Sequence, residues 1–353
     1  MSRILLLDGG LGTSLEDSYS ITFTPSTPLW SSHLLLTPQG QNTLLACQRD
    51  FASIPVDVLL TPTYQVSIEG FANSKTEEFP DGVPRDKIGG FLRDAVRIAE
   101  CARTVQGTRL ALSLGPYGAC MVPGQEYSGR YDEEHDGEEA LFRWNLERLM
   151  LFVREELMNR VGYVAFETIP RADEVRAVRR AVKAAGIKTP FWVSCVFPVE
   201  ETMNLPDGSA VDEVLHAMLG RSVDGAVPWG VGINCTKIHK LPALVREFGE
   251  CTAQMIESGE IPSPPALVIY PDGTNGEVYN TTTQKWERRE DVDTKNRRPW
   301  EVQLAQLVRD AQDKGPFSSF LVGGCCKASC NDIERLRLQL NSQEKEQSTS
   351  HGK

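Results

Sequence analysis

This sequence lacks the long apolar runs, the excess of basic residues and the clustered histidines that mark several large functional classes. No stretch approaches the roughly 20 apolar residues that a membrane-spanning helix needs. The 353 residues carry a net charge of −11, which disfavours binding to nucleic acid or to an anionic membrane. The five histidines show no spacing typical of metal ligands. We therefore expect neither a nucleic-acid partner nor a membrane partner.

Several common motifs are also missing. The sequence contains no nucleophile elbow, no Walker loop and no paired Cys-x-x-Cys motifs. The apolar run Ile4–Leu7 is too short for a signal peptide, and Asp8-Gly9-Gly10 ends it. Nine cysteines at irregular spacing do not resemble the disulfide framework of a secreted protein. We expect a cytoplasmic protein with reduced thiols.

Short apolar runs rich in β-branched residues alternate with longer amphipathic segments along the chain. Strands are expected at Ile4–Asp8, Val58–Thr61, Leu110–Leu114, Tyr163–Phe166, Phe191–Val196, Trp229–Asn234, Ala266–Tyr270 and Phe317–Val322. Helices are expected at Gln41–Ser53, Lys87–Gln106, Glu138–Arg160, Asp173–Ala185, Ala210–Leu219, Leu241–Ser258, Trp300–Lys314 and Asn331–Leu340. This alternation predicts an α/β fold, a single (β/α)8 TIM barrel, with a doubly wound sheet as the alternative.

The chain shows no internal linker or compositional shift, so we expect one barrel domain over residues 1–341. The polar stretch Pro271–Arg298 is expected to be a long loop after the seventh strand. Residues 342–353 contain no large apolar side chain, and we expect them to form a disordered polar tail.

Three cysteines stand where predicted buried strands end. Cys235 follows Gly232–Asn234, and the adjacent Cys325 and Cys326 follow Gly323–Gly324. Because strand ends of a barrel gather on one face, these thiols could together hold one soft metal ion. Three thiolates leave one tetrahedral position of a zinc ion open, as in catalytic zinc sites. The alternative is that each cysteine is a small buried hydrophobic residue.

Two acidic residues also stand at predicted strand ends. Glu167 ends an apolar strand, where an unpaired carboxylate is costly to bury; it could pair with an arginine. Alternatively, Asp8 and Glu167 form an acidic pocket suited to an α-ammonium group. The turn after Asp8 resembles a nucleotide-binding loop, but the next good strand lies only near Val58, too far along the chain for that fold. We interpret Gly9 and Gly10 as making room for a ligand.

A set of motifs covers about residues 3–340 of the chain: Leu6–Thr13, Pro28–Ser31, Thr63–Gln65 with Gly70–Phe71, Ser113–Gly118, Phe166–Pro170, Gly232–Thr236 and Gly323–Cys326. In order and spacing they resemble the homocysteine S-methyltransferases, specifically the short, cobalamin-independent kind that uses S-methylmethionine or S-adenosylmethionine. The resemblance implies a (β/α)8 barrel that transfers a methyl group from a sulfonium donor to the thiol of homocysteine and forms methionine.

The resemblance also implies a set of site residues. Zn²⁺ would be held by Cys235, Cys325 and Cys326, and would activate the substrate thiol without a further catalytic side chain. The implied substrate-binding residues are Asp8, Gly9, Gly10, Tyr64, Glu167 and Asn234. Among these, Asp8 and Glu167 would contact the amino group of homocysteine, and Tyr64 would occupy the open zinc position before substrate arrives. The implied partners are small-molecule substrates.

The sequence departs from the family pattern beside this site. Pro62 stands where Asn is common, and Lys327-Ala328 stands where Arg-Thr is common, which leaves the donor preference open. The donor pocket is expected to include loop 116–131, whose Tyr117, Tyr127 and Tyr131 could face a cation or could simply pack. The alternatives are betaine as donor, selenocysteine as acceptor, or a non-catalytic zinc- or thiol-binding sensor.

Overall fold

The structure, a computed structural model, describes residues 2–24, 27–274, 277–280, 285–288 and 298–350. Eight parallel strands form one sheet in the order β1-β10-β7-β6-β5-β4-β3-β2. They are β1 (Arg3–Leu6), β2 (Val58–Leu60), β3 (Arg109–Leu114), β4 (Tyr163–Ile169), β5 (Phe191–Cys195), β6 (Gly230–Asn234), β7 (Ala266–Tyr270) and β10 (Ser319–Val322). A parallel bridge between Leu7 and Val58 joins the two edge strands and closes the barrel. The (β/α)8 barrel is confirmed, and the doubly wound alternative is excluded.

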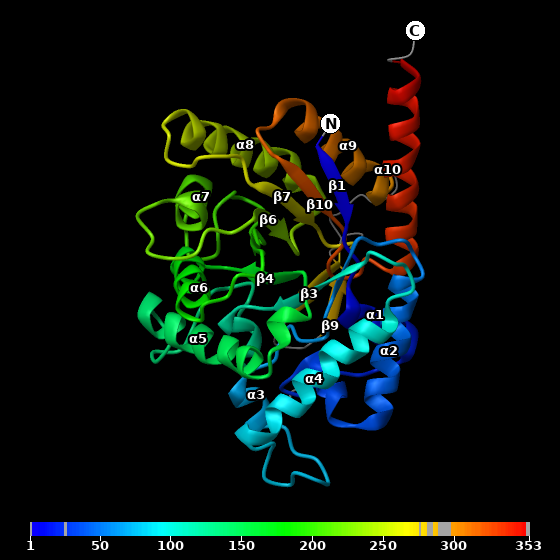
Figure 1. Cartoon of the computed structure of the whole chain (residues 1–353), viewed down its shortest axis with the longest axis vertical. Coiled ribbons are helices and arrows are strands. Elements are labelled where there is room, and N and C mark those ends of the chain that lie inside the picture. The colour runs from blue at the N-terminus through cyan, green and yellow to red at the C-terminus, as the bar shows by residue number, and fades with distance from the viewer. Residues whose placement is uncertain (1, 25–26, 275–276, 281–284, 289–297, 351–353) are drawn as a thin grey trace.

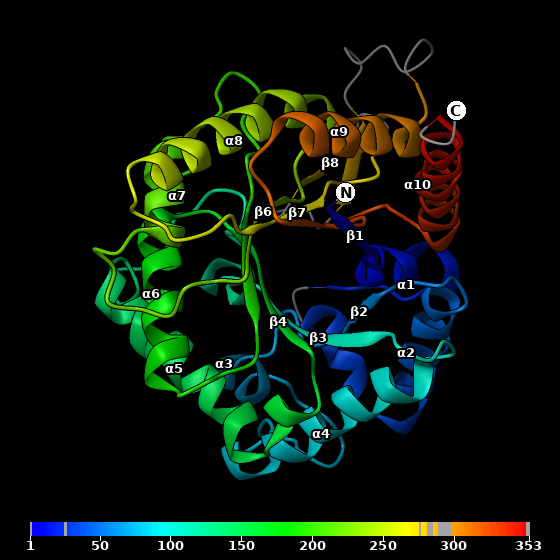
Figure 2. The same cartoon turned by 45° about the horizontal axis from the view of Figure 1, so that its top comes forward.

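Helices surround the strands, as Figure 2 shows. They are α1 (Leu11–Tyr19), α2 (Pro38–Ala52), α3 (Ile68–Ala72), α4 (Arg85–Ala102), α5 (Glu138–Arg154), α6 (Ala172–Ala184), α7 (Val211–Leu219), α8 (Leu241–Glu257), α9 (Trp300–Lys314) and α10 (Cys330–Ser350). Short 3-10 helices lie at Trp30–Leu36, Tyr117–Cys120, Leu157–Asn159 and Ile238–Lys240. Every predicted strand and helix is present; α1 and α3 were not predicted. In α6 the apolar stripe of Val175, Val178 and Val182 is buried, as its helical spacing predicted.

The barrel interior is filled by side chains and is not a pore. A cluster that includes Tyr163, Trp192 and Tyr270 packs inside the strands, separate from the larger core between strands and helices. The Trp192 indole donates a hydrogen bond to the Tyr270 hydroxyl at 3.1 Å. Tyr270 ends β7 and also borders the cavity at the carboxyl ends of the strands. The packed interior therefore forms the floor of that cavity.

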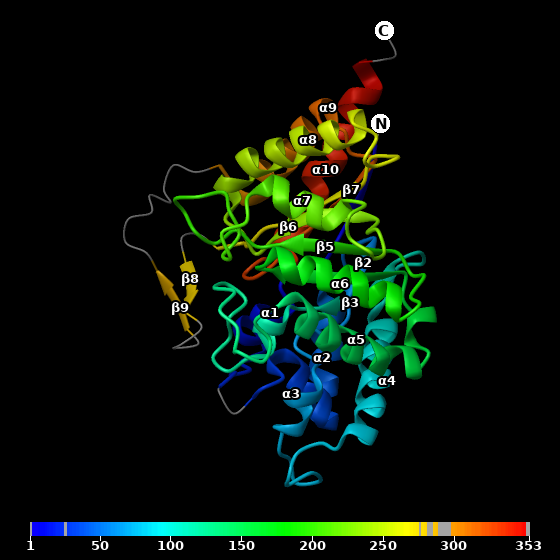
Figure 3. The same ribbon diagram turned by 90° about the vertical axis from the view of Figure 1, so that its left-hand side faces the viewer.

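The prediction of a long loop over Pro271–Arg298 is wrong in part. Two antiparallel strands lie there, β8 (Glu277–Asn280) and β9 (Lys285–Arg288), and Figure 3 shows them projecting from the barrel. Each strand mixes its few apolar residues with charged ones, so it lacks the continuous apolar run that marks the barrel strands. The remainder of that stretch, residues 275–276, 281–284 and 289–297, lies outside the described residues.

The C-terminal segment differs from the expected polar tail as far as the structure describes it. Helix α10 continues through Ser350 and extends away from the barrel, as Figure 1 shows. The backbone therefore has no break at residue 342, and residues 351–353 lie outside the described part. The division into a 1–341 domain and a separate tail stays a prediction. Among the described residues, no helix has the length and apolarity to cross a membrane.

Candidate metal and substrate site

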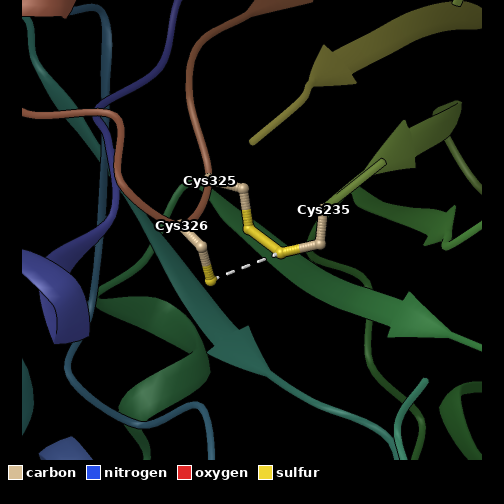
Figure 4. Close-up of side chains that lie close together, drawn as sticks. All are labelled: Cys235, Cys325 and Cys326. Atoms are coloured by element: carbon tan, nitrogen blue, oxygen red, sulfur yellow. Dashed lines mark hydrogen bonds between the residues drawn. A yellow bond between two sulfur atoms is a disulfide. The ribbon is translucent and has the colours of Figure 1, made fainter. Parts of the chain in front are cut away.

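The three cysteines singled out in the sequence meet at the carboxyl ends of β6 and β10. Their Sγ atoms all lie within 4.8 Å of one another. Cys235 and Cys325 are joined by a disulfide, and the Cys326 sulfur lies 3.8 Å from that of Cys235 (Figure 4). The sequence predicted that all three thiols are reduced, whereas in the structure two of them form this disulfide. The Cα atoms of Cys235 and Cys325 are 5.4 Å apart, within the range that a disulfide spans. Cysteines placed closely enough to share a metal ion are therefore also close enough to form a disulfide.

These thiols fit a soft metal ion by their chemistry. Burial first, and then the charge of Asp272, raises the pKa of the Cys326 thiol to about 12. A thiol in such surroundings is protonated unless a cation lies beside it, and a metal ion deprotonates a coordinating thiol outright. Three sulfurs on one wall, with a cavity on the open side, leave room for a further ligand from substrate. The group can thus hold a metal once the disulfide is reduced.

Asn234 supports this wall from behind. It is fully buried at the end of β6. Its amide oxygen accepts a hydrogen bond from Thr168 N at 2.7 Å, and its amide nitrogen donates to Thr168 Oγ1 at 2.8 Å. The same nitrogen lies 3.8 Å from the Cys325 sulfur. Asn234 is not one of the described residues that line the cavity. Contact between Asn234 and substrate therefore stays a prediction.

One cavity adjoins the sulfurs. Of the residues singled out in the sequence, its walls include Gly9, Gly10, Tyr64, Glu167, Cys235, Cys325 and Cys326. Asp8 lies just beneath the lining and is buried. The structure therefore gathers residues from β1, β2, β4, β6 and β10, which are far apart in the sequence, around a single space.

Asp8 and Glu167 are buried carboxylates that form no ion pair among the described residues, although the charge of Arg148 acts to lower the pKa of Glu167. Asp8 Oδ2 accepts a hydrogen bond from Leu60 N at 2.9 Å, whereas Asp8 Oδ1 is buried and unpaired there. Glu167 accepts from the Ser113 hydroxyl and is hydrogen-bonded to Tyr270, so it does not form the alternative arginine pair. Burial raises the pKa of Glu167 to about 7; burial and then the charge of Glu167 raise that of Asp8 well above its ordinary value. A substrate ammonium group would compensate both carboxylates.

Gly9 and Gly10 allow two backbone segments to touch. A Cβ atom on Gly10 would lie 2.4 Å from the Cys325 carbonyl oxygen, and one on Gly9 would lie 2.3 Å from that of Ala328. The Gly10 amide donates to the Ala328 oxygen at 2.9 Å. Both glycines also border the cavity, and the close approach that the structure shows is to the cysteine loop. That these glycines make room for a ligand stays a prediction.

Tyr64 and loop 116–131 supply a further part of the cavity wall. Tyr64 and Tyr127 line the cavity, and the Tyr127 hydroxyl lies 4.0 Å from the Cys326 sulfur. Tyr117 and Tyr131 bind protein groups instead: the former donates to Asp132, the latter to Glu174 at 2.5 Å. Of the three loop tyrosines expected at the donor pocket, only Tyr127 reaches the described lining.

Glu126 and Trp286 are among the cavity residues that the sequence did not reveal. Glu126 is buried on loop 116–131, and Trp286 comes from β9 within the stretch predicted as a loop. An acidic residue amid polar loop neighbours gives no burial signal in the sequence. Trp286 could have been noticed as a large aromatic residue in an otherwise polar segment.

The two departures from the family pattern occupy different places. Pro62 borders the cavity, and its carbonyl oxygen accepts a hydrogen bond from Ser32 at 2.9 Å. The Lys327 ammonium pairs with Asp17 at 2.7 Å and lies 5.2 Å from the centre of the Trp286 ring. Lys327 thus joins the cysteine loop to α1 and to the β8–β9 hairpin.

Comparison with known proteins identifies the family to which this chain belongs. Residues 5–340 match the sequence family described as homocysteine S-methyltransferase. The chain belongs to this family. It is 26% identical to homocysteine S-methyltransferase 2 of Arabidopsis thaliana, over 95% of this chain and 92% of that protein. It is also 26% identical to a selenocysteine Se-methyltransferase of Brassica oleracea var. italica, over 96% and 89%.

A solved structure has the same fold as this homocysteine S-methyltransferase family member. The metallated form of the homocysteine methyltransferase MmuM from Escherichia coli superposes with a TM-score of 0.68, at 23% identity and with 96% of each chain covered. At that identity the likeness supports the barrel fold alone.

Proposed function

We propose that this protein transfers a methyl group from a sulfonium donor, S-methylmethionine or S-adenosylmethionine, to the thiol of L-homocysteine, forming methionine. Zn²⁺ is the proposed metal, held by Cys235, Cys325 and Cys326. The observation that carries the proposal is the placement of three converging thiols and two buried carboxylates, neither in an ion pair among the described residues, at one cavity. That combination suits a substrate with both a thiol and an ammonium group.

The chain's own residues have separate tasks in this reaction. Zinc held by the three cysteines would lower the pKa of the substrate thiol, so that its proton is released to solvent and its sulfur stays nucleophilic. Asp8 and Glu167 accept hydrogen bonds from the substrate ammonium and fix where the sulfur lies. The substrate sulfur forms a bond to the donor methyl as the methyl–sulfonium bond breaks, and the released electron pair leaves a neutral thioether. Asn234 orients Cys325 from behind.

Selenocysteine is a second candidate acceptor, because the family includes relatives named for that substrate at the same level of identity. Its selenol and ammonium groups suit the same thiol site and the same carboxylates. The proposed compartment is the cytoplasm, since metal binding requires reduced thiols at Cys235 and Cys325.

The test combines zinc-loaded, reduced protein with homocysteine or selenocysteine and with S-methylmethionine, S-adenosylmethionine or betaine. We expect methionine from homocysteine and a sulfonium donor. Cys325→Ala should lose both zinc and activity, whereas Cys330→Ala, at a nearby cysteine outside the trio, should keep both. Stoichiometric zinc without product from any pair would favour a non-catalytic sensor. Full zinc occupancy in Cys325→Ala would reject the proposed ligands.

A further inference from the structure

We propose that Glu126 binds the α-ammonium group of the methyl donor and thereby selects sulfonium donors that are also amino acids. This inference rests on the proposed methyl transfer and adds to it a residue that recognises the second substrate.

The carboxylate of Glu126 is buried beside the cavity and has no cationic partner among the described residues. The side chain is 8% exposed and lines the same cavity as Cys326. Its Oε2 atom is fully buried and has no hydrogen-bond partner among the described residues. Burial raises the pKa of this carboxyl group to about 7, and only its own backbone amide acts to lower it. No described cation compensates its charge. An isolated buried carboxylate is costly, so a cationic ligand is the expected partner.

The loop is built to hold this carboxylate in place. A Cβ atom on Gly124 would lie 2.5 Å from Glu126 Oε2, so the glycine leaves the space that this carboxylate oxygen occupies. The Gln125 amide donates to the Gly118 oxygen at 2.8 Å and ties the middle of the loop to its start. Buried Glu174 of α6 accepts from Tyr117 N at 2.7 Å and from the Tyr131 hydroxyl, which fixes both ends. The Glu126 site is therefore preorganised.

Glu126 occupies a place separate from the Asp8–Glu167 pair. Burial and then the charge of Glu167 raise the pKa of Asp8, whereas neither Asp8 nor Glu167 is among the groups that shift the pKa of Glu126. Burial, then the charge of Glu126 and, less strongly, that of Glu167 raise the pKa of the Tyr64 hydroxyl, so Tyr64 lies within reach of both acidic positions. The cavity thus has two separate acidic positions. Homocysteine and S-methylmethionine each carry one α-ammonium group, so the two positions match the two substrates.

Transition-state energetics favour the donor ammonium over the donor sulfonium as the partner of Glu126. The sulfonium loses its positive charge as the methyl group leaves, so a carboxylate paired with it would stabilise the reactant more than the transition state. The ammonium keeps its charge throughout, and its pairing strengthens binding without slowing transfer. Tyr64, Tyr127 and Trp30 also line the cavity, and their ring faces suit a sulfonium without an opposing charge.

The test compares Glu126→Gln with the wild type, using S-methylmethionine and dimethylsulfoniopropionate, a sulfonium that lacks the ammonium group. Charge-assisted hydrogen bonds of this kind correspond to about 10- to 100-fold in binding. We expect Kd and KM for S-methylmethionine to rise about 10- to 100-fold, with kcat changed by no more than a few fold. The Kd of dimethylsulfoniopropionate, measured by calorimetry without an acceptor, should stay within about twofold.

Three controls make the result decisive. Glu69→Gln removes one negative charge from an exposed carboxylate near the same loop and should leave both donors unaffected. The KM for homocysteine and the far-ultraviolet circular dichroism of Glu126→Gln should match the wild type, and Glu126→Asp should recover part of the donor affinity. Equal weakening of both donors, or none for S-methylmethionine, would overturn the role of Glu126. Failure of the proposed function is distinct, because the wild type itself would then form no methionine.

Discussion

The cavity has two walls that are held in place by different means. The strand wall comprises Asp8, Glu167 and the three cysteines, at the ends of barrel strands. It continues the hydrogen-bond ladder of the sheet: Cys235 N donates to the Tyr270 oxygen at 3.2 Å and Cys325 N to the Pro271 oxygen at 2.8 Å. The register of the sheet therefore positions the sulfurs.

The loop wall comprises Glu126 and Tyr127 on loop 116–131, and helices hold it through buried charged side chains. Arg148 of α5 donates to the carbonyl oxygens of Tyr64 and Gly115 at 2.6 Å each. Glu174 of α6 accepts hydrogen bonds from Tyr117 N and from the Tyr131 hydroxyl, near the two ends of the loop. The proposed acceptor site is thus part of the barrel itself, while the proposed donor site depends on a few long-range polar contacts.

The largest expected effect concerns the strand wall alone. A disulfide between Cys235 and Cys325 uses two of the three sulfurs that the metal needs, so oxidised protein should bind no zinc and have no activity. Reduction should restore about one zinc per chain, because the metal competes only for free thiolates. Zinc stoichiometry and thiol titration, before and after reduction, measure this. Full zinc binding by protein with the bridge intact would show that the strand wall is not the metal site.

A smaller effect should separate the two walls. Glu167→Gln removes one carboxylate charge from the proposed homocysteine site, and we expect the KM for homocysteine to rise about 10- to 100-fold. The KM for the sulfonium donor should stay within a few fold, because that donor is proposed to bind the loop wall. Steady-state kinetics with each substrate varied in turn provides the measurement. An equal rise in both KM values would mean that the walls do not act separately.

We expect the smallest effect on methyl transfer from a change at Glu174, the residue of α6 that supports the loop wall. Burial raises the pKa of Glu174 to about 7, from an ordinary value of 4.5. Between these values the folded protein holds a proton that the unfolded chain has lost. The Glu174 contribution to stability therefore falls as pH rises through this interval, by up to about 3 kcal/mol, and levels off above it.

Glu174→Gln should remove this pH dependence while leaving zinc binding intact. The free energy of unfolding of the variant, relative to wild type, should increase between pH 5 and pH 8; urea unfolding at several pH values measures it. Asp224→Asn, at an exposed carboxylate paired with Lys183, serves as the control and should not reproduce the change. A constant difference across pH would mean that Glu174 is already ionised in the folded protein at pH 5.

The sequence predicted the strand wall because its residues follow continuous apolar runs. In a parallel barrel, such runs end on one face, so the sequence alone placed Asp8, Glu167 and the cysteines at that face. The loop wall gave no comparable signal. Glu126 is one of 48 acidic residues, and nothing in its local sequence distinguishes it from those that face solvent. It is nevertheless buried beside the cavity.

The apolar periodicity of the sequence by itself determined the alternation of strands and helices and the elements that carry the thiols, since burial of each strand on both faces requires that pattern. The closure of the sheet into a barrel, which excludes the doubly wound alternative, came from the structure. Only the tertiary structure decided which groups lie within reach of one another. It joined Cys235 to Cys325, placed Asn234 behind the sulfurs and turned Glu126 into the cavity. Those contacts link residues up to 91 positions apart, and their geometry depends on side-chain packing that local sequence does not specify.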